Sequence, residues 1–317
     1  MSVLVVVEHD RGQLADASLE ALAFAGGLAA QLGVAVDALL IGVDAAALAD
    51  ECTAHGASTV HHVADPALTD YGPDAHGAVV AAAAAALSPA AIVASGSDRG
   101  NEVLAYAAAE LDLPFVANCV DVKAADEWEI TRVQWGGSLN EDARLTSSMP
   151  ILSVAPHALD AADPVAGVAA TVQTLEVSLP ASATVSMIQD RIVLSEGVTL
   201  ATAPVVVGGG RGVGSAEGFD VLEALAAKLG GVVGCSRAVT NNGWRPHADQ
   251  VGQTGTRIAP QLYIACGISG AIQHWVGAKA AKKVLAINTD PAANMVVKAD
   301  YAVIGDLFEV LPAIEAS

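Results

Sequence analysis

A glycine-rich segment is the clearest candidate for a phosphate-binding turn. Gly208–Gly214 reads Gly-Gly-Gly-Arg-Gly-Val-Gly and follows the apolar run Pro204–Val207. Glycines between a strand and a helix let the backbone approach a phosphate, and the helix N-terminus supplies N–H donors. Arg211 would then provide the counter-charge. The alternative is that the glycines only permit a tight turn.

The same segment lacks the signatures of the common nucleotide-binding loops. No register gives G-x-G-x-x-G, and there is no Gly-Lys-Ser/Thr of a P-loop. The next predicted strand ends at Ser236-Arg237, where an NAD-binding domain would carry an acidic residue for the ribose. The pattern therefore favours a phosphate-bearing ligand other than NAD.

Two later segments carry polar residues at predicted loop positions. Gln250–Gly255 reads Gln-Val-Gly-Gln-Thr-Gly, which alone is more often ordinary turn chemistry. Gly267–His274 directly follows a predicted strand, so the Ser269 hydroxyl could cap a helix or reach a phosphate. His274 lies about one helical turn beyond Gly270, within reach of a ligand, although a lone histidine is as often structural.

The second of these segments carries a specific family resemblance. Leu262–Gly277, followed by Val284–Asn288, closely resembles the signature of the electron-transfer flavoprotein alpha subunit family. Other stretches resemble the same family in the same order, more loosely in the first half: Val7–His9, Gly136–Ser138, Glu141–Arg144, Gly209–Gly212, Ser236-Arg237 and Gln250–Gly255. Two departures are Asn241-Asn242, where many members have an acidic residue, and Gly218, where asparagine is usual.

The resemblance implies that FAD lies in the C-terminal domain. Arg211 would contact the pyrophosphate, Ser269–Ile272 would close on the phosphates, and Asn288 with Asp306 and Leu307 would hold the adenosine. Around the isoalloxazine, Thr254 would lie near N5, His274 near the O2 edge, and Arg237 would add positive charge. The full expected cofactor set is Arg211, Ser236, Arg237, Val251, Gly252, Gln253, Thr254, Ser269, Gly270, Ala271, Ile272, Gln273, His274, Asn288, Asp306 and Leu307, with no catalytic residue and no metal ligand.

The resemblance also implies a function and partners. The chain would pair with a beta subunit that holds AMP or a second FAD. It would shuttle single electrons from flavoprotein dehydrogenases, such as the acyl-CoA dehydrogenases of fatty acid beta-oxidation, to a quinone-linked acceptor. It would thus be a redox carrier rather than a substrate-converting enzyme. Two alternatives are a pyridine-nucleotide oxidoreductase on a similar fold and a regulatory nucleotide-binding module.

The elements that must position these residues alternate between strands and helices. Val3–Val7, Val34–Ile41, Thr59–Val63 and Ala91–Ala94 are predicted strands, separated by predicted helices at 14–32, 44–55, 76–87 and 101–111. Residues 129–134 and 143–146 predict an antiparallel addition. A second unit has predicted strands at 204–207, 232–235, 261–265, 284–287 and 301–304, a helix at 216–229, and Asp306 capping the last helix.

We therefore expect an α/β fold of two open, doubly wound parallel-sheet domains, the second a Rossmann-like FAD-binding domain. The predicted boundary gives residues 1–190 to an α/β domain for assembly with the beta subunit and 191–317 to FAD binding. Gly96–Gly100 lies at another predicted strand-to-helix junction. We interpret it as a capped helix start rather than a phosphate site.

Composition limits the classes of partner. With 35 acidic and 15 basic residues, the net charge is −20, which disfavours nucleic acid and anionic membranes. The longest apolar stretch, Ala78–Ala94, is interrupted by Ser88-Pro89, so we expect no membrane span. The first residues predict a strand rather than a signal peptide, and the four scattered cysteines indicate reduced thiols. We expect a cytoplasmic protein.

Overall fold

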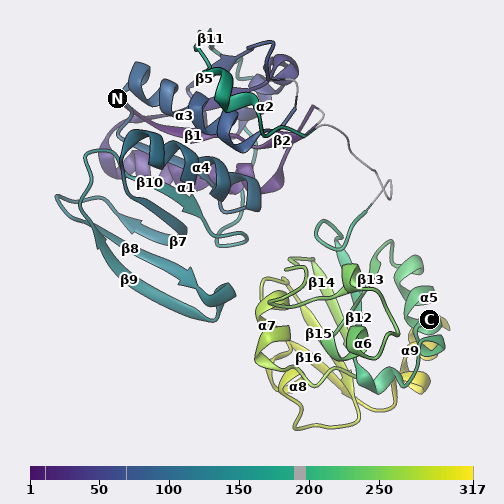
Figure 1. Ribbon diagram of the computed structural model, residues 1–317. Coiled ribbons are helices and arrows are strands. Elements are labelled where there is room, and N and C mark those ends of the chain that lie inside the picture. Colours follow the sequence, from purple (N-terminus) through teal and green to yellow (C-terminus); the bar gives the residue numbers. More distant parts are fainter. Residues whose placement is uncertain (11, 69, 189–197, 317) are drawn as a thin grey trace. The chain divides into compact units, whose positions relative to one another are not determined.

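A computed structural model describes residues 1–10, 12–68, 70–188 and 198–316 of the chain (Figure 1). Contacts within the chain divide it into two compact units. The first comprises residues 1–134 and 140–192, and the second comprises residues 135–139 and 193–317. The boundary predicted at residue 190 lies outside the described residues.

The first unit is built on one mixed sheet. Its described strands have the order β11-β5-β4-β1-β6-β10-β7-β8-β9. From β11 to β7 the neighbours are parallel, whereas β8 runs antiparallel to β7. The bounds are β1 Ser2–Val6, β4 Ala35–Ile41, β5 Thr59–Val63, β6 Ala91–Ser95, β7 Phe115–Lys123, β8 Trp128–Gln134, β9 Leu139–Leu145, β10 Ile151–Val154 and β11 Val172–Thr174. The antiparallel addition predicted around residues 129–146 is confirmed.

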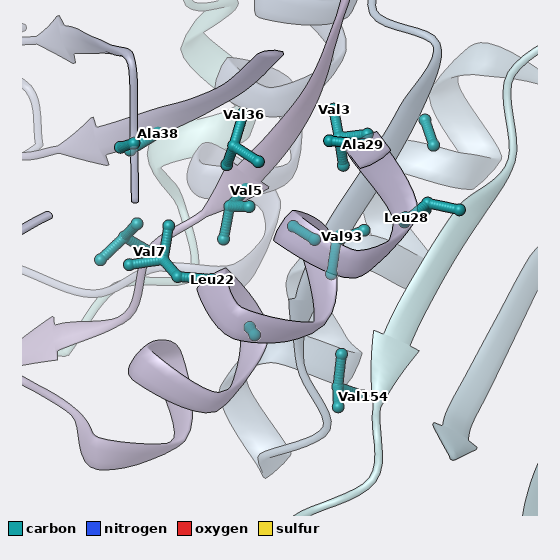
Figure 2. Close-up of a cluster of buried hydrophobic side chains, with 14 of the residues drawn as sticks. Val3, Val5, Val7, Leu22, Leu28, Ala29, Val36, Ala38, Val93 and Val154 are labelled. Carbon is teal, nitrogen blue, oxygen red and sulfur yellow. The ribbon is translucent and has the colours of Figure 1, made fainter. Parts of the chain in front are cut away.

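Helices cover both faces of this sheet, as the alternation of side chains along β1 requires. Val3 and Val5 face α1 (Asp16–Leu32) and pack in one cluster with Leu22 (Figure 2). Leu4 belongs to the opposite cluster, with apolar residues of α3 and α4. These two helices span Pro73–Leu87 and Asp98–Leu111. Every residue of β1 is buried, which explains the apolar run Val3–Val6.

One predicted helix has a different form. Residues 44–55 contain a 3-10 helix at Val43–Leu48 and then a short α2 at Ala49–Ala54. Alanine favours an α-helix, but a 3-10 helix rises about 2.0 Å per residue rather than about 1.5 Å.

The second unit has a parallel sheet with the described strand order β13-β12-β14-β15-β16. These strands are β12 Val205–Gly209, β13 Val232–Cys235, β14 Leu262–Cys266, β15 Val284–Asn288 and β16 Tyr301–Ile304. The helices are α5 Asp220–Lys228, α6 Arg237–Asn241, α7 Ile272–Ala278, α8 Asn294–Lys298 and α9 Leu307–Ala316. The predicted helix at 216–229 is a 3-10 turn, Glu217–Phe219, followed by α5.

Two apolar clusters pack on the two faces of this sheet. One joins α5 and α9 through Leu222 and Leu311, and the other includes Ala278 of α7 and Met295 of α8. The predicted class, open and largely parallel α/β in both halves, is confirmed. Among the described residues, no helix combines the length and apolar character needed to cross a bilayer.

The close packing of α3 on α4 yields a stability test at Gly77. A Cβ there would lie 2.4 Å from Tyr106 Cβ and 3.2 Å from the Ala107 nitrogen. Overpacking costs about 1–3 kcal/mol, which exceeds the gain of about 1 kcal/mol from alanine in a helix. Gly77→Ala should therefore lower the free energy of unfolding, measured by urea denaturation with circular dichroism.

The matched control is Gly27→Ala in α1, where a Cβ meets nothing within 4 Å. This change should raise the free energy of unfolding by about 0.5–1 kcal/mol, because only the helix propensity changes. Shifts of the same sign in both variants would contradict the packing argument.

Candidate functional site

The carboxyl ends of four strands in the second unit meet at one cavity of about 380 Å³. Arg211 follows β12, Ser236 follows β13, Ser269 follows β14 and Asn288 ends β15; all four line the cavity. Parallel sheets bind ligands at this edge. The strand order thus gathers residues that are up to 77 positions apart in the sequence (288 − 211).

A second cavity, of about 430 Å³, lies beside the start of α6. Arg237, Gln250 and Thr254 line it, together with Thr240, Asn241 and His247. Ser236 and Arg237 are consecutive, so one strand-to-helix turn contributes a residue to each cavity. Of the residues that the resemblance assigned to the isoalloxazine, Arg237 and Thr254 line this second cavity, whereas His274 lines neither cavity.

The glycines after β12 are required by protein packing. A Cβ on Gly208 would lie 2.4 Å from Tyr263 Oη, and one on Gly210 would lie 2.2 Å from the Gly267 carbonyl oxygen. A Cβ on Gly212 would lie 2.7 Å from Gly267 Cα. The tight-turn interpretation therefore accounts for these glycines. The same close approach presses the turn after β12 against the turn after β14.

Arg211 and Arg237 are exposed, and neither guanidinium makes a hydrogen bond or ion pair with any residue that the structure describes. Arg245, in the same unit, is different: its guanidinium pairs with Glu223 and, at 2.8 Å, with Asp249. In a chain of net charge −20, arginines without carboxylate partners lie where an anionic ligand can neutralise them.

Thr254 is held by a short chain of side-chain hydrogen bonds. The buried Gln250 accepts a hydrogen bond from Thr240 Oγ1 at 2.8 Å and donates one to Thr254 Oγ1 at 3.0 Å. Because the Thr254 oxygen accepts here, its own hydroxyl proton is free to donate. The arrangement fixes one donor at the wall of the second cavity.

His274, in α7, is buried and paired through one ring nitrogen. Its Nε2 lies 2.7 Å from Tyr263 Oη, whereas Nδ1 is buried without a hydrogen-bond partner. Burial lowers the pKa of His274 to about 4, with the Val251 backbone acting in the opposite direction. The ring is therefore neutral at pH 7, and Arg237 rather than His274 supplies positive charge.

The loop that carries Val251, Gly252 and Gln253 is locked onto α7. Val251 is buried and its N–H donates to the Cys235 carbonyl at 2.8 Å; the Gln253 N–H donates to the Gln273 carbonyl at 2.8 Å. Gly252 has φ +145°, and a Cβ on Gly277 would lie 2.4 Å from Gly252 Cα. Backbone contacts thus set the distance between Thr254 and His274.

The turn after β14 uses left-handed backbone at Gly267 and Gly270, with φ of +61° and +77°. Ala271 is the N-cap of α7 and provides no side-chain bond, so the Ser269 hydroxyl does not cap this helix. Ser269 instead lines the first cavity. The side chains of Ala271 and Ile272 are exposed.

The residues expected at the adenosine end have structural partners. Asn288 Nδ2 donates to the Ile268 carbonyl at 3.0 Å and Oδ1 accepts from the Asp290 N–H, so its amide holds the turn after β14. Asp306 caps α9 by accepting from the Phe308 N–H at 2.9 Å. Leu307 is buried in the core, and neither Asp306 nor Leu307 lines either cavity.

Sequence reasoning did not single out Gln250, Thr240 or Tyr263, which position Thr254 and His274. Gln250 opens the polar segment 250–255, but its burial cannot be read from the sequence. Tyr263 lies among apolar residues of β14 and resembles an ordinary core residue. Tyr263 stands out only by its full burial beside Gly208, and this burial becomes visible only once the pairing of β12 with β14 is known.

The metal-ligating side chains and the thiols of the described residues do not meet the requirements of a metal site or of a reactive cysteine. No group of three or more His, Cys, Asp or Glu side chains there could hold a metal ion. Cys52, Cys119, Cys235 and Cys266 are free and buried. Burial raises the pKa of each thiol to about 12.

Comparison with known proteins finds two family models. Residues 3–180 match the electron transfer flavoprotein domain, and residues 199–279 match the electron transfer flavoprotein FAD-binding domain. The electron transfer flavoprotein subunit alpha of Bacillus subtilis is 35% identical over 98% of this chain and 95% of its own length. That of Mycobacterium tuberculosis is 37% identical over 98% and 96%. A probable mitochondrial one from Caenorhabditis elegans is 35% identical over 100% and 93%.

The low pKa of His274 predicts how stability depends on pH. In the unfolded chain this histidine gains a proton below about pH 6.5, whereas in the folded chain it stays neutral until about pH 4. Unfolding is thus increasingly favoured as the pH falls through this window. Between pH 6.5 and 5, the free energy of unfolding should fall by about 2 kcal/mol less in His274→Gln than in the wild type. The measurement is urea denaturation of the cofactor-free chain at both pH values. An unchanged pH dependence would contradict the burial of a neutral ring.

Proposed function

The chain belongs to the electron transfer flavoprotein family as an alpha subunit with that family's FAD-binding domain, and we propose that it carries electrons on an FAD held at the carboxyl edge of its second sheet. The observation that carries this placement is the pair Arg211 and Arg237. Each is exposed, has no described partner, and lines one of two neighbouring cavities in a strongly acidic chain.

The residues present fit such a cofactor. FAD needs a positive group for its pyrophosphate and polar donors along its ring system. Arg211, with Ser236 and Ser269 in the same cavity, supplies the first. The free hydroxyl proton of Thr254, at the wall of the second cavity, supplies the second.

We assign the remaining roles by position. Arg211 binds the pyrophosphate, and the backbone of Ser269–Ile272 closes on it. Arg237 places positive charge beside the ring system, and Thr254 donates a hydrogen bond to it. Asn288 acts by holding the turn after β14, while Asp306 and Leu307 can offer only backbone atoms or the exposed carboxylate of Asp306 to the adenosine. Bound FAD supplies the redox chemistry, and these groups orient it and set its potential.

We further propose that residues 1–190 assemble with a beta subunit, which holds AMP or a second FAD. Exposed apolar side chains on the first unit support a partner there: Tyr106, Val165, Val168 and Val172. The electron donors would be flavoprotein dehydrogenases, including acyl-CoA dehydrogenases, and the acceptor a quinone-linked oxidoreductase. Because Ser236 rather than an acidic residue follows β13, a pyridine-nucleotide enzyme is disfavoured.

Removing the Arg211 guanidinium tests the phosphate site. Arg211→Ala should weaken FAD binding by about 2–4 kcal/mol, roughly 30- to 1000-fold in Kd, because it deletes a charge-assisted contact. The measurement is flavin absorbance retained on gel filtration, with Kd from titration of the cofactor-free protein.

Lys228→Ala is the matched control. It also removes one positive charge, but from the last turn of α5, at the opposite end of the unit's strands. Its FAD affinity should equal that of the wild type. If Arg211→Ala retains FAD as well as Lys228→Ala does, Arg211 has no role in binding the pyrophosphate.

Assembly with the beta subunit gives a separate test. Co-expressed chains should purify as a yellow one-to-one complex that releases FAD on denaturation, whereas the alpha chain alone should aggregate or hold FAD poorly. Chromatography with light scattering and flavin analysis measures both properties. A stable alpha monomer with full flavin content would refute the need for a partner.

A further inference from the structure

The first unit contains a larger cavity of its own, about 690 Å³, that the electron-carrier function does not use. It lies at the carboxyl ends of β1, β4 and β6. The strands β4 and β5 add to one side of β1, and the chain then crosses over so that β6 adds to the other side. Such a reversal opens a crevice between β1 and β6, where doubly wound sheets bind ligands. The volume lies in the usual range for small-molecule sites.

The position that a phosphate would take at this crevice is filled by the protein itself. The Glu8 carboxylate, just after β1, accepts hydrogen bonds from Ser95 Oγ at 3.2 Å and from Ser97 Oγ. Ser97 is the N-cap of α4 and accepts from the Gly100 N–H at 2.9 Å. Gly100 is needed for packing, because a Cβ there would lie 2.0 Å from the Ser95 carbonyl oxygen. A fixed negative charge thus occupies the start of α4.

The remaining charges around the cavity also disfavour an anion. Its wall includes the carboxylates of Glu8, Asp10, Asp44 and Asp70, against the single guanidinium of Arg99 among the described lining residues. Arg99 is engaged: it lies 4.0 Å from Asp10 and its guanidinium stacks 4.8 Å from the centre of the Tyr71 ring. The charges of the described lining residues therefore favour an uncharged or cationic ligand.

One wall offers an aromatic surface. The Tyr71 and His76 rings are 5.2 Å apart and tilted, and Tyr71 Oη is fixed by donating to Glu102 at 2.9 Å. Burial lowers the pKa of His76 to about 4, so this ring is neutral at pH 7. Leu68 and Val103 add apolar area to the cavity. A planar heterocycle suits such a wall.

The opposite wall offers an acceptor for hydroxyl groups. Asp44 follows β4, the strand beside β1, and lines the cavity. It is exposed and makes no hydrogen bond or ion pair with a described residue. An acidic residue after the second strand is the group that binds the ribose diol in doubly wound domains.

We propose that the cavity between β1 and β6 binds an uncharged purine nucleoside, with its base against Tyr71 and His76 and its ribose hydroxyls on Asp44. The bound species lacks a phosphate because Glu8 already occupies the start of α4. This site is separate from the FAD edge of the second unit and does not depend on it.

Isothermal titration calorimetry of the full chain, in its complex with the beta subunit, tests the proposal with adenosine as the probe. Adenosine should show one saturable event that Ala47→Trp removes, because Ala47 is an exposed residue of the cavity wall. Only binding that this substitution removes is assigned to the cavity, which separates it from any nucleotide site in the partner. In that cavity, AMP and 2′-deoxyadenosine should each bind at least tenfold more weakly.

Asp44→Ala should weaken the binding of adenosine at least tenfold. Asp126 is an exposed carboxylate outside the cavity, and Asp126→Ala should leave this binding unchanged. Circular dichroism should show the same unfolding midpoint for each variant. Absence of an Ala47-dependent event, equal effects of the two aspartate substitutions, or AMP binding as tightly as adenosine would each overturn the proposal.

Discussion

The close approach of two glycine turns is the constraint on which the cofactor edge depends. Gly210 and Gly212, after β12, lie against Gly267, after β14, with no room for a Cβ on either side. This contact brings Arg211 and Ser269 to one cavity, although more than one strand and one helix separate them in the sequence. A second backbone contact, Gly252 against Gly277, sets the loop of Thr254 beside the helix of His274. The side chains that line the two cavities of this edge are therefore positioned by backbone packing, which is stiffer than side-chain hydrogen bonding.

The charged side chains also differ between the surface and the two cavity edges. Several cations among the described residues form ion pairs on the surface, as Arg132 does with Glu141 and Lys283 with Asp300. Arg211 and Arg237 have no such partner among the described residues, and each lies at a strand end. The cavity of the first unit shows the reverse arrangement, because Glu8 fills the place where an anion would bind. The cavities at the carboxyl edges of the two sheets thus differ in charge, with unpaired guanidinium groups at one and a buried carboxylate at the other.

Much of this could be predicted from the sequence, for identifiable reasons. Runs such as Val205–Val207 are apolar because parallel strands are covered on both faces, so their positions and the fold class follow directly. The family could be predicted from the segment 262–277. The neutral state of His274 could not, because it results from burial against Tyr263 of a neighbouring strand. Gln250 was missed for the same reason: its role depends on the pairing of its loop with Cys235. A helix was predicted at 44–55, but its division into a 3-10 helix and the short α2 was not, because alanine propensity alone favours one continuous α-helix.

Cys235 and Cys266 are the last residues of β13 and β14, immediately before the residues that line the cofactor cavity. Sulfur so close to a redox group invites oxidation, yet only a thiolate reacts readily with peroxide or with a disulfide. With a pKa of about 12, roughly one thiol in 10⁵ is ionised at neutral pH. Both thiols thus stay protonated at neutral pH, and their sulfur atoms add packing volume beside the first cavity rather than a reactive thiolate.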